Sequence, residues 1–159
     1  MVDVADRAVA AVGLVEGPVH VECKVNGAQV WFLELAARTI GGLCTRALEY
    51  GGVSLEELVI RHALSSPLPT RPPGDATGVL MLPVPNSGRL NSVHGVEAAR
   101  AVSGITEVTI TIGPGDWVQG LPEGDRYLGF VFAKAGTPDQ VEAALREAWA
   151  ALRADISVS

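Results

Sequence analysis

Cysteine, basic residues and long apolar runs are all scarce in this sequence, and each scarcity argues against a class of protein. Only two cysteines occur in 159 residues, Cys23 and Cys44, without the spacing of a metal site, so both are predicted to be reduced thiols of a cytoplasmic protein. The 12 lysines and arginines form no cluster and are outnumbered by 18 acidic residues, which argues against nucleic acid as a partner. No apolar run approaches the roughly 20 residues of a membrane helix, and the acidic start is unlike a signal peptide, so no membrane partner is expected.

Apolar residues are plentiful instead, at 48%, which is enough for a packed core in one domain or two small ones. Four prolines fall within the seven residues 67–73, and such a stretch cannot continue a helix. We therefore predict a boundary near Pro72, with one part over 1–72 and another over 73–159. The expected fold class is α+β.

Local signals predict the elements of each part. In the first part we expect a helix over 5–12, a hairpin, a helix that ends at Gly51-Gly52, and a helix that begins at Ser54 with Glu57 completing a capping box. In the second part the pattern predicts strands at 78–85, 105–112 and 126–133, a short helix within 95–105 and a last helix that begins at Thr137. Because the strand at 78–85 ends in prolines, it is expected at a sheet edge.

The hairpin is predicted by Asn26-Gly27 between two apolar stretches, each of which carries one glutamate. A two-residue loop would put Glu22 and Glu34 on opposite faces. A three-residue loop, which pairs Val25 with Gln29, would make them diagonal neighbours on one face, roughly 7 Å apart at the backbone. We favour the second register because it collects these residues on one apolar face: Val19, Val21, Cys23, Trp31, Leu33 and Leu35.

Two carboxylates so close together repel each other, and two interpretations follow. A hard divalent cation such as Mg²⁺ binds between them, or the face is wet and both glutamates are simply solvated. His20 and Lys24 would share this face. The histidine can contact a substrate or act as a hydrogen-bonded packing residue, and the lysine can neutralise the carboxylates.

Arg38 and Gly41-Gly42 follow the second glutamate closely. The planar guanidinium of arginine suits a phosphate or a carboxylate, and glycines before a helix let backbone N–H groups approach an anion. Two carboxylates, an arginine and an anion-binding turn together predict a phosphoryl-transfer site.

The order of these residues resembles a known family. "HVE", a dozen residues, "LELAAR" and "GG" are similar to the C-terminal half of an ATP-grasp domain. "SLEELVIRHAL", "GVLMLPVP", "GITEVTITIGPGD" and "LPEGDRYLGFVFAKAGTPDQVEAALREA" resemble the tail of carboxylate–amine ligases, especially L-amino acid ligases. The resemblance implies an ATP-grasp antiparallel sheet piece with helices over 1–72 and a small α+β C-terminal domain over 73–159.

That resemblance also implies roles for the residues. Glu22 and Glu34 would hold Mg²⁺ on ATP, Arg38 would stabilise the transferred phosphoryl group, and the Gly41-Gly42 amides, with His20 nearby, would help to bind the nucleotide. The implied reaction is attack of a carboxylate on ATP, followed by capture of the acyl phosphate by an amine.

Two departures from the family pattern qualify this reading. Ala36 stands where the motif often has an asparagine that assists the metal, which argues against a piece of a biotin-dependent carboxylase. The 21 residues before Glu22 contain neither a P-loop nor the upstream half of the nucleotide site. We therefore expect a C-terminal part of a ligase that needs an upstream ATP-grasp half as partner, with an exposed apolar surface where that half would bind.

The expected substrates are a small carboxylate and an amine, and the chain alone is expected to be incomplete as an enzyme. A non-catalytic module for assembly or dimerisation, derived from the same fold, stays open as an alternative, as does a homo-oligomeric state.

Overall fold

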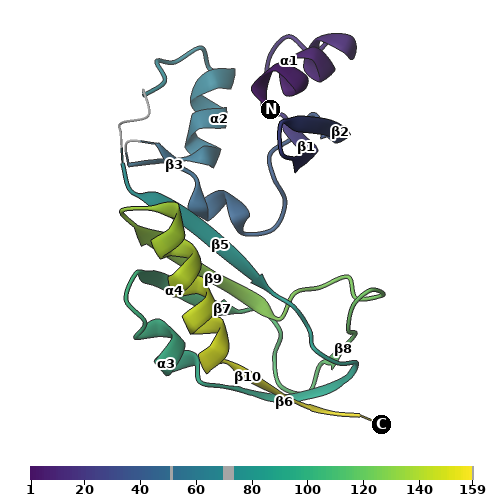
Figure 1. Cartoon of the computed structure of the whole chain (residues 1–159), viewed down its shortest axis with the longest axis vertical. Coiled ribbons are helices and arrows are strands. Elements are labelled where there is room, and N and C mark those ends of the chain that lie inside the picture. Colours follow the sequence, from purple (N-terminus) through teal and green to yellow (C-terminus); the bar gives the residue numbers. More distant parts are fainter. Residues whose placement is uncertain (51, 70–73, 159) are drawn as a thin grey trace. The chain divides into compact units, whose positions relative to one another are not determined.

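The computed structural model describes residues 1–50, 52–69 and 74–158, and the chain divides into two compact units, Met1–Pro72 and Pro73–Ser159 (Figure 1). Pro72, near which the boundary is predicted, lies outside the described residues. Both units combine helices with antiparallel strands, so the predicted α+β class is confirmed. None of the helices in the described ranges is long and apolar enough to cross a membrane.

The first unit is built from one hairpin and short elements. In chain order these are α1 (Val2–Ala11), β1 (His20–Asn26), β2 (Gln29–Ala36), the 3-10 helix η1 (Cys44–Ala47), β3 (Glu49–Tyr50), β4 (Val53–Ser54) and α2 (Leu55–Ala63). β1 pairs with β2 and β3 with β4, each pair antiparallel, and α1 packs against β2. The helix α1 starts three residues before the predicted range and ends before Gly13, whose φ is +70°.

The predicted helix that ends at Gly51-Gly52 is wrong. Only the four residues of η1 are helical, because Leu48 is already extended (φ −106°, ψ 94°) and the following strand β3 pairs with β4. The Ser54 cap is confirmed, since its hydroxyl accepts the Glu57 N–H at 3.2 Å. The Glu57 carboxylate does not close the capping box but accepts two hydrogen bonds from Arg61, at 2.6 and 2.8 Å.

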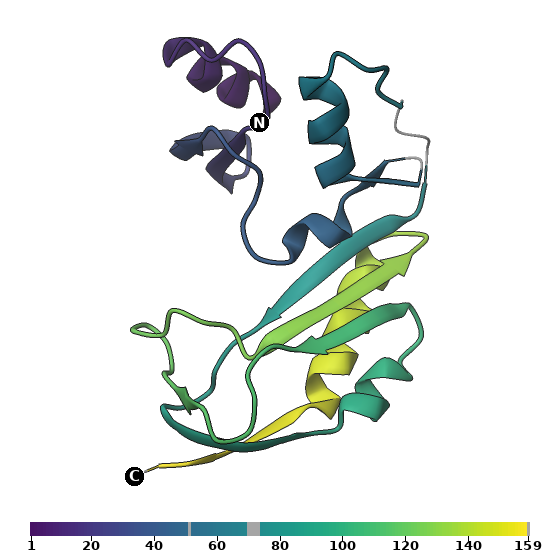
Figure 2. The same cartoon turned by 180° about the vertical axis from the view of Figure 1, so that it is seen from behind.

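The second unit contains two three-stranded antiparallel sheets. One has the order β5 (Ala76–Leu82), β9 (Gly129–Ala135), β7 (Ile105–Ile110), and the other β10 (Arg153–Ser157), β6 (Gly88–His94), β8 (Trp117–Val118). The helices α3 (Val96–Arg100) and α4 (Pro138–Ala151) cover one face of the first sheet (Figure 1). In the view from behind, this sheet lies in front of α4 (Figure 2). The strand β5 lies at a sheet edge, as predicted, and the prolines of the predicted strand follow its last residue, Leu82.

The core of this unit lies between the sheets and α4. Leu82, Leu90, Val131 and Ala148 are fully buried at its centre. The helix α4 approaches β5 so closely that a Cβ at Gly78 would lie 2.6 Å from Val141 Cγ1. The Thr137 cap is confirmed, since its hydroxyl accepts the Gln140 N–H at 3.3 Å. The strands β6, β8 and β10 were not predicted.

Candidate functional site

The glutamate pair lies at the centre of the hairpin. Glu22 on β1 is directly opposite Glu34 on β2, so the two side chains share a face, and His20 is opposite Ala36 at the next position on that face. The favoured register predicts a shared face, but with the glutamates as diagonal neighbours. The structure brings them closer than that.

Both predicted registers are wrong in detail. The two central residues of the turn are Gly27 and Ala28, because Asn26 pairs with Gln29 and Gly27 adopts φ +58°, which suits the first central position of a tight hairpin turn. A bulge then shifts the register between Glu22 and Cys23, which leaves Leu33 as the extra residue of β2.

The bulge also divides the predicted apolar face. Cys23 pairs with Phe32, and Trp31 pairs with Lys24 instead of Cys23. As a result Trp31, Phe32 and Leu33 remain 44%, 47% and 59% exposed. The hairpin thus carries its two carboxylates beside an uncovered apolar surface.

The two carboxylates lie on an exposed face of the hairpin. Like charges directly opposite on a sheet destabilise it, and in the described part of the chain the Glu34 carboxylate has no hydrogen bond or ion pair. His20 Nε2 lies 3.9 Å from Glu22 Oε1, and its side chain is less exposed (23%) than that of Glu22 (51%). The imidazole therefore lies beside the Glu22 carboxylate, at a separation longer than a hydrogen bond.

The donor set fits magnesium bound mainly through a phosphate ligand. Magnesium is typically held by one or two carboxylates, with water and phosphate oxygens completing an octahedron. Within residues 1–50, 52–69 and 74–158 no group of three or more His, Cys, Asp or Glu side chains converges as a metal cage. If the pair Glu22 and Glu34 binds magnesium, the remaining ligands would have to be water or phosphate oxygens.

Arg38 follows the end of β2, in the loop that leads to η1. Its Nη1 donates to its neighbour's carbonyl, Thr39 O, at 2.9 Å, and its own N–H donates to Ala36 O, also at 2.9 Å. The guanidinium is exposed, and a Cβ built at Gly41 would lie 4.0 Å from Nη1, so arginine and glycine face the same space. Arg38 can exchange its carbonyl partner for an anionic oxygen.

The predicted helix after the two glycines is replaced by η1, and this weakens the proposed anion-binding helix start. Gly42 has φ +65°, a conformation that glycine adopts at low cost. A 3-10 helix of only four residues contributes little dipole, so any anion at Gly41-Gly42 would be held by individual N–H groups and by Arg38.

A groove beside the hairpin was not predicted. It measures about 920 Å³ and lies between α1 and β2, lined mainly by apolar side chains with Arg7 as its charged member. The signal was present in the sequence, because Val4, Ala8 and Ala11 recur at helical spacing on one face of α1.

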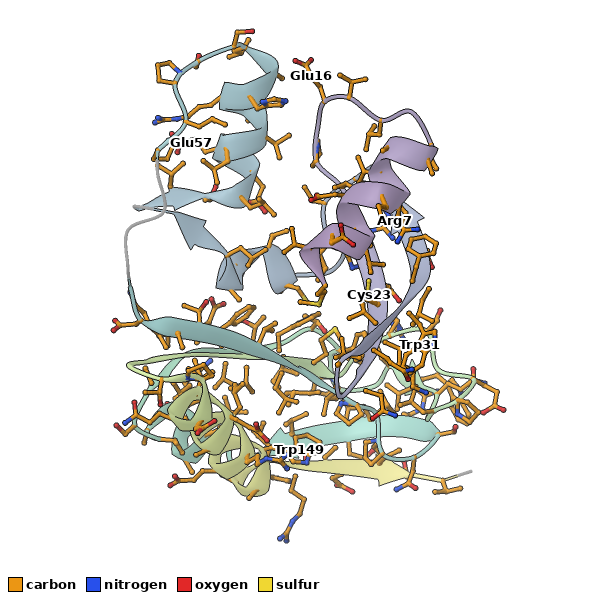
Figure 3. All side chains as sticks on the ribbon, turned by 45° about the horizontal axis from the view of Figure 1, so that its top comes forward. Arg7, Glu16, Cys23, Trp31, Glu57 and Trp149 are labelled. Atoms are coloured by element: carbon orange, nitrogen blue, oxygen red, sulfur yellow. The ribbon has the colours of Figure 1, made fainter. Side chains whose placement is uncertain are left out.

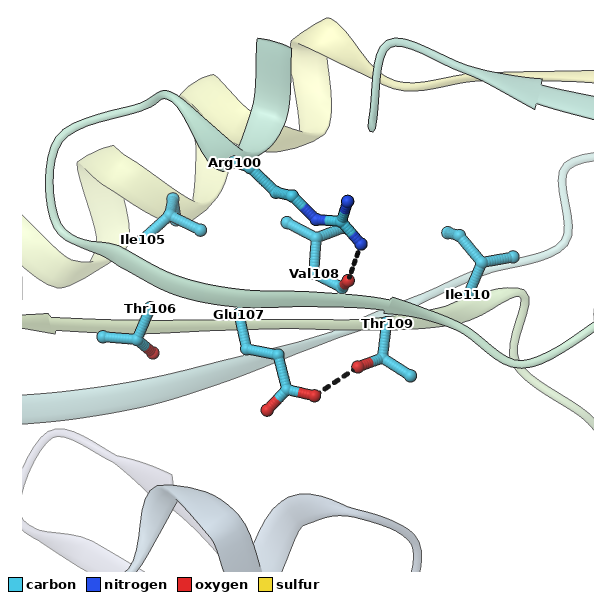
Figure 4. A pocket seen from close by; sticks show the side chains of 7 residues that line it. All are labelled: Arg100, Ile105, Thr106, Glu107, Val108, Thr109 and Ile110. Atoms are coloured by element: carbon cyan, nitrogen blue, oxygen red, sulfur yellow. Dashed lines mark hydrogen bonds between the residues drawn. The ribbon is translucent and has the colours of Figure 1, made fainter. Parts of the chain in front are cut away.

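The second unit has a pocket of about 480 Å³ along the outer edge of β7 (Figure 4). Arg100 reaches from α3 and donates to Val108 O at 3.1 Å, while Thr109 donates to Glu107 at 2.5 Å. Arg100 thereby covers an otherwise open carbonyl of this edge strand, a common protection against edge-to-edge pairing.

Comparison with known proteins gives a family match for the second unit. Residues 80–157 match the family described as L-amino acid ligase C-terminal domain 2. A search of curated proteins finds no match.

Solved structures match nearly the whole chain. The L-amino acid ligase from Bacillus licheniformis is 24% identical with a TM-score of 0.82, over 99% of this chain and 40% of that one. Phosphoribosylglycinamide synthetase from Anaerococcus prevotii is 18% identical with a TM-score of 0.72, over 96% of this chain and 40% of that one. N5-carboxyaminoimidazole ribonucleotide synthetase from Thermotoga maritima is 16% identical with a TM-score of 0.71, over 98% of this chain and 41% of that one. The chain thus has the fold of these proteins over about 40% of their length.

Proposed function

Residues 80–157 match the family of L-amino acid ligase C-terminal domains 2, and from this premise we propose that the chain is the C-terminal part of an ATP- and magnesium-dependent carboxylate–amine ligase. The observation that carries the proposal is the placement of Glu22 directly opposite Glu34, with Arg38 in the loop that follows. The substrates would be an amino acid or similar carboxylate and an amine.

Each residue would have a distinct role in the transfer of a phosphoryl group from ATP to the carboxylate. The Glu22 and Glu34 carboxylates would hold magnesium, which supplies charge neutralisation on the phosphates when bound. His20, 3.9 Å from Glu22, would orient that carboxylate. Arg38 would leave Thr39 O and donate to the oxygens of the transferred group.

The proposed reaction has two steps. The carboxylate oxygen forms a bond to the terminal phosphorus of ATP while the bond to ADP breaks, and the acyl phosphate is then attacked by the amine with release of phosphate. Arg38 and the N–H groups of Gly41-Gly42 would stabilise the negative charge in both steps, because such reactions depend mainly on positioning and electrostatics.

The upstream half of the nucleotide site would come from a partner polypeptide or from the rest of a longer chain. Its absence from the described fold is consistent with the 40% coverage of the ligase from Bacillus licheniformis. We propose a cytoplasmic location, because Cys23 and Cys44 are both free thiols.

The test is ADP release in a reconstituted mixture. This chain is combined with the N-terminal part of the Bacillus licheniformis ligase, the part of that enzyme beyond the matched 40%, together with ATP, magnesium and pairs of amino acids. We expect turnover that Glu34→Gln abolishes and Glu16→Gln preserves, since Glu16 is an exposed carboxylate outside the hairpin pair. Absence of ADP and phosphate with every amino-acid pair would refute the proposal.

A non-catalytic assembly module is a second candidate, which the exposed Trp31, Phe32 and Leu33 favour. Such a module would keep its partner when Glu22 and Glu34 are both replaced by glutamine, whereas the ligase would lose turnover.

A further inference from the structure

A long loop of the second unit has charged groups and exposed apolar side chains that the proposed reaction does not use. It connects β7 to β9 over 111–128 and includes the short strand β8 (Figure 1). Trp117, Leu121 and Tyr127 in this loop are 53%, 66% and 40% exposed. Exposed apolar side chains that gather in one place mark binding sites more often than scattered ones do.

Two cavities lie against this loop. The larger measures about 260 Å³ and the smaller about 60 Å³. Buried Ile112 and Val118 and the exposed indole of Trp117 give the larger one apolar walls. Pockets for drug-sized ligands measure about 300–1,000 Å³, so this space suits a smaller molecule. The two cavities share four lining residues, Val84, Gln119, Asp125 and Arg126.

The two charged residues among these four have opposite signs and do not pair with each other. In the part of the chain that the structure describes, Asp125 has no hydrogen bond or ion pair. Arg126 has one hydrogen bond, in which Nη2 donates to Trp117 O at 2.8 Å, and its remaining N–H groups stay available. A ligand that bears both an anionic and a cationic group can therefore satisfy both side chains at once.

The loop is held in place by its own hydrogen bonds, so the cavity exists before a ligand binds. Gly120 N donates to Ser87 Oγ at 3.0 Å, and Gly124 N donates to Gly120 O at 3.0 Å. A Cβ at Gly124 would overlap Gln119 O, so the two sides of the loop are in direct backbone contact. A site formed in advance does not lose the free energy of ordering a loop on binding.

We propose that this cavity binds a free amino acid with an apolar side chain. The ligand carboxylate accepts hydrogen bonds from Arg126, and the ligand ammonium donates to Asp125. The apolar side chain packs against Val84, Ile112 and Trp117. A metal cation would use Asp125 alone and a simple anion would use Arg126 alone, whereas the zwitterionic head of an amino acid uses both. The site lies within the second unit and includes no hairpin residue, so the inference does not depend on the proposed ligase function.

Calorimetric titration of L-leucine into the whole chain tests the proposal. Two analogues of leucine each lack one charge: isocaproate has no ammonium group, and isopentylamine has no carboxylate. We expect one leucine to bind per chain, and each analogue to bind at least tenfold more weakly, because it leaves one side chain of the cavity unpaired. Absence of leucine binding, or equal binding of leucine and either analogue, would overturn the proposal.

Matched variants locate the ligand. Asp125→Asn and Arg126→Gln should each weaken leucine binding at least tenfold, and the first removes no hydrogen bond of the free chain. Asp116→Asn and Arg153→Gln are the controls, because they neutralise exposed charges that line neither cavity, and they should leave binding unchanged. Unchanged binding in Asp125→Asn or in Arg126→Gln, or an equal loss in the controls, would contradict the assignment.

Trp117 reports on the cavity directly. Figure 3 shows Trp31 on the hairpin and Trp149 on α4, and neither lines the cavity. A Trp31→Phe, Trp149→Phe variant therefore leaves Trp117 as the only tryptophan. Leucine should shift its emission to shorter wavelength and reduce its quenching by acrylamide, because the ligand covers part of an indole that is 53% exposed. Unchanged Trp117 emission at saturating leucine would refute contact with this wall.

A last variant separates this site from the proposed ligase site. Glu34→Gln should leave leucine binding by the chain unchanged, although it is expected to abolish ADP release in the reconstituted mixture. Loss of leucine binding in Glu34→Gln would place the amino acid at the hairpin and overturn the proposal. Leucine binding in the absence of any ADP release would support this site and refute the ligase function.

Discussion

Replacing Glu34 by glutamine should have opposite effects on the free chain and on the chain with ligand. In the free chain Glu22 and Glu34 are directly opposite, and residues so placed have Cβ atoms about 5 Å apart. Two unit charges at that distance repel by about 0.8 kcal/mol in water, and a glutamine removes this repulsion. We therefore predict that Glu34→Gln raises the free energy of unfolding of the first unit by about 0.2–1 kcal/mol at low salt. The gain should shrink as salt screens the charges.

The assay is urea unfolding of a Trp117→Phe, Trp149→Phe variant, in which Trp31 is the only tryptophan, followed by Trp31 fluorescence at low and high salt. With magnesium and ADP present, the wild-type chain should be more stable than the variant. Its two glutamates then gain a cation, whereas the variant lacks one of the two ligands. Glu16→Gln is the control and should change neither measurement. A variant that is less stable than wild type without ligand, or that responds to magnesium and ADP as wild type does, would refute the reasoning.

Three further predictions concern the fold. Leu82→Ala should lower the free energy of unfolding of the second unit by about 2–5 kcal/mol in urea denaturation, because Leu82 is fully buried in its core; a loss below that range would mean that the cavity collapses. Ser54→Ala should lower the free energy of unfolding of the first unit by about 0.5–2 kcal/mol, since it leaves the Glu57 N–H of α2 without its acceptor, and Ser54→Asp should restore most of this free energy. Burial raises the pKa of the Cys44 thiol, so its alkylation at pH 8 should be slow and should accelerate as the pH rises; rapid labelling at pH 8 would contradict the burial of Cys44.

Elements with a local signal could be predicted from the sequence. The caps at Ser54 and Thr137 depend on one side chain and a nearby N–H, and both are present. The edge position of β5 agrees with the prolines that follow its last residue, which cannot donate hydrogen bonds to a neighbouring strand.

Elements that depend on distant pairing could not be predicted. The strands β6 and β10 pair across a long stretch of chain, with His94 opposite Arg153. Likewise, the sequence pattern before Gly52 predicts a helix, but Tyr50 pairs with Val53 and belongs to a strand.

The candidate site shows the same division. The spacing of Glu22 and Glu34 alone allows two registers, and the grouping of apolar residues on one face favours the register in which the glutamates share a face. Their direct opposition depends on the turn at Gly27 and on the bulge at Leu33, and no composition rule specifies either. The groove was missed because the apolar spacing on α1 does not specify the element on which that face packs, which is β2.

The most direct measurement of the central proposal is a calorimetric titration of magnesium-ADP into this chain paired with the N-terminal part of the Bacillus licheniformis ligase. We predict binding by the wild-type pair that disappears with Glu34→Gln and persists with Glu16→Gln. Equal binding by the Glu34→Gln pair, or no binding by the wild-type pair, would contradict the assignment of the hairpin glutamates to the magnesium–nucleotide site.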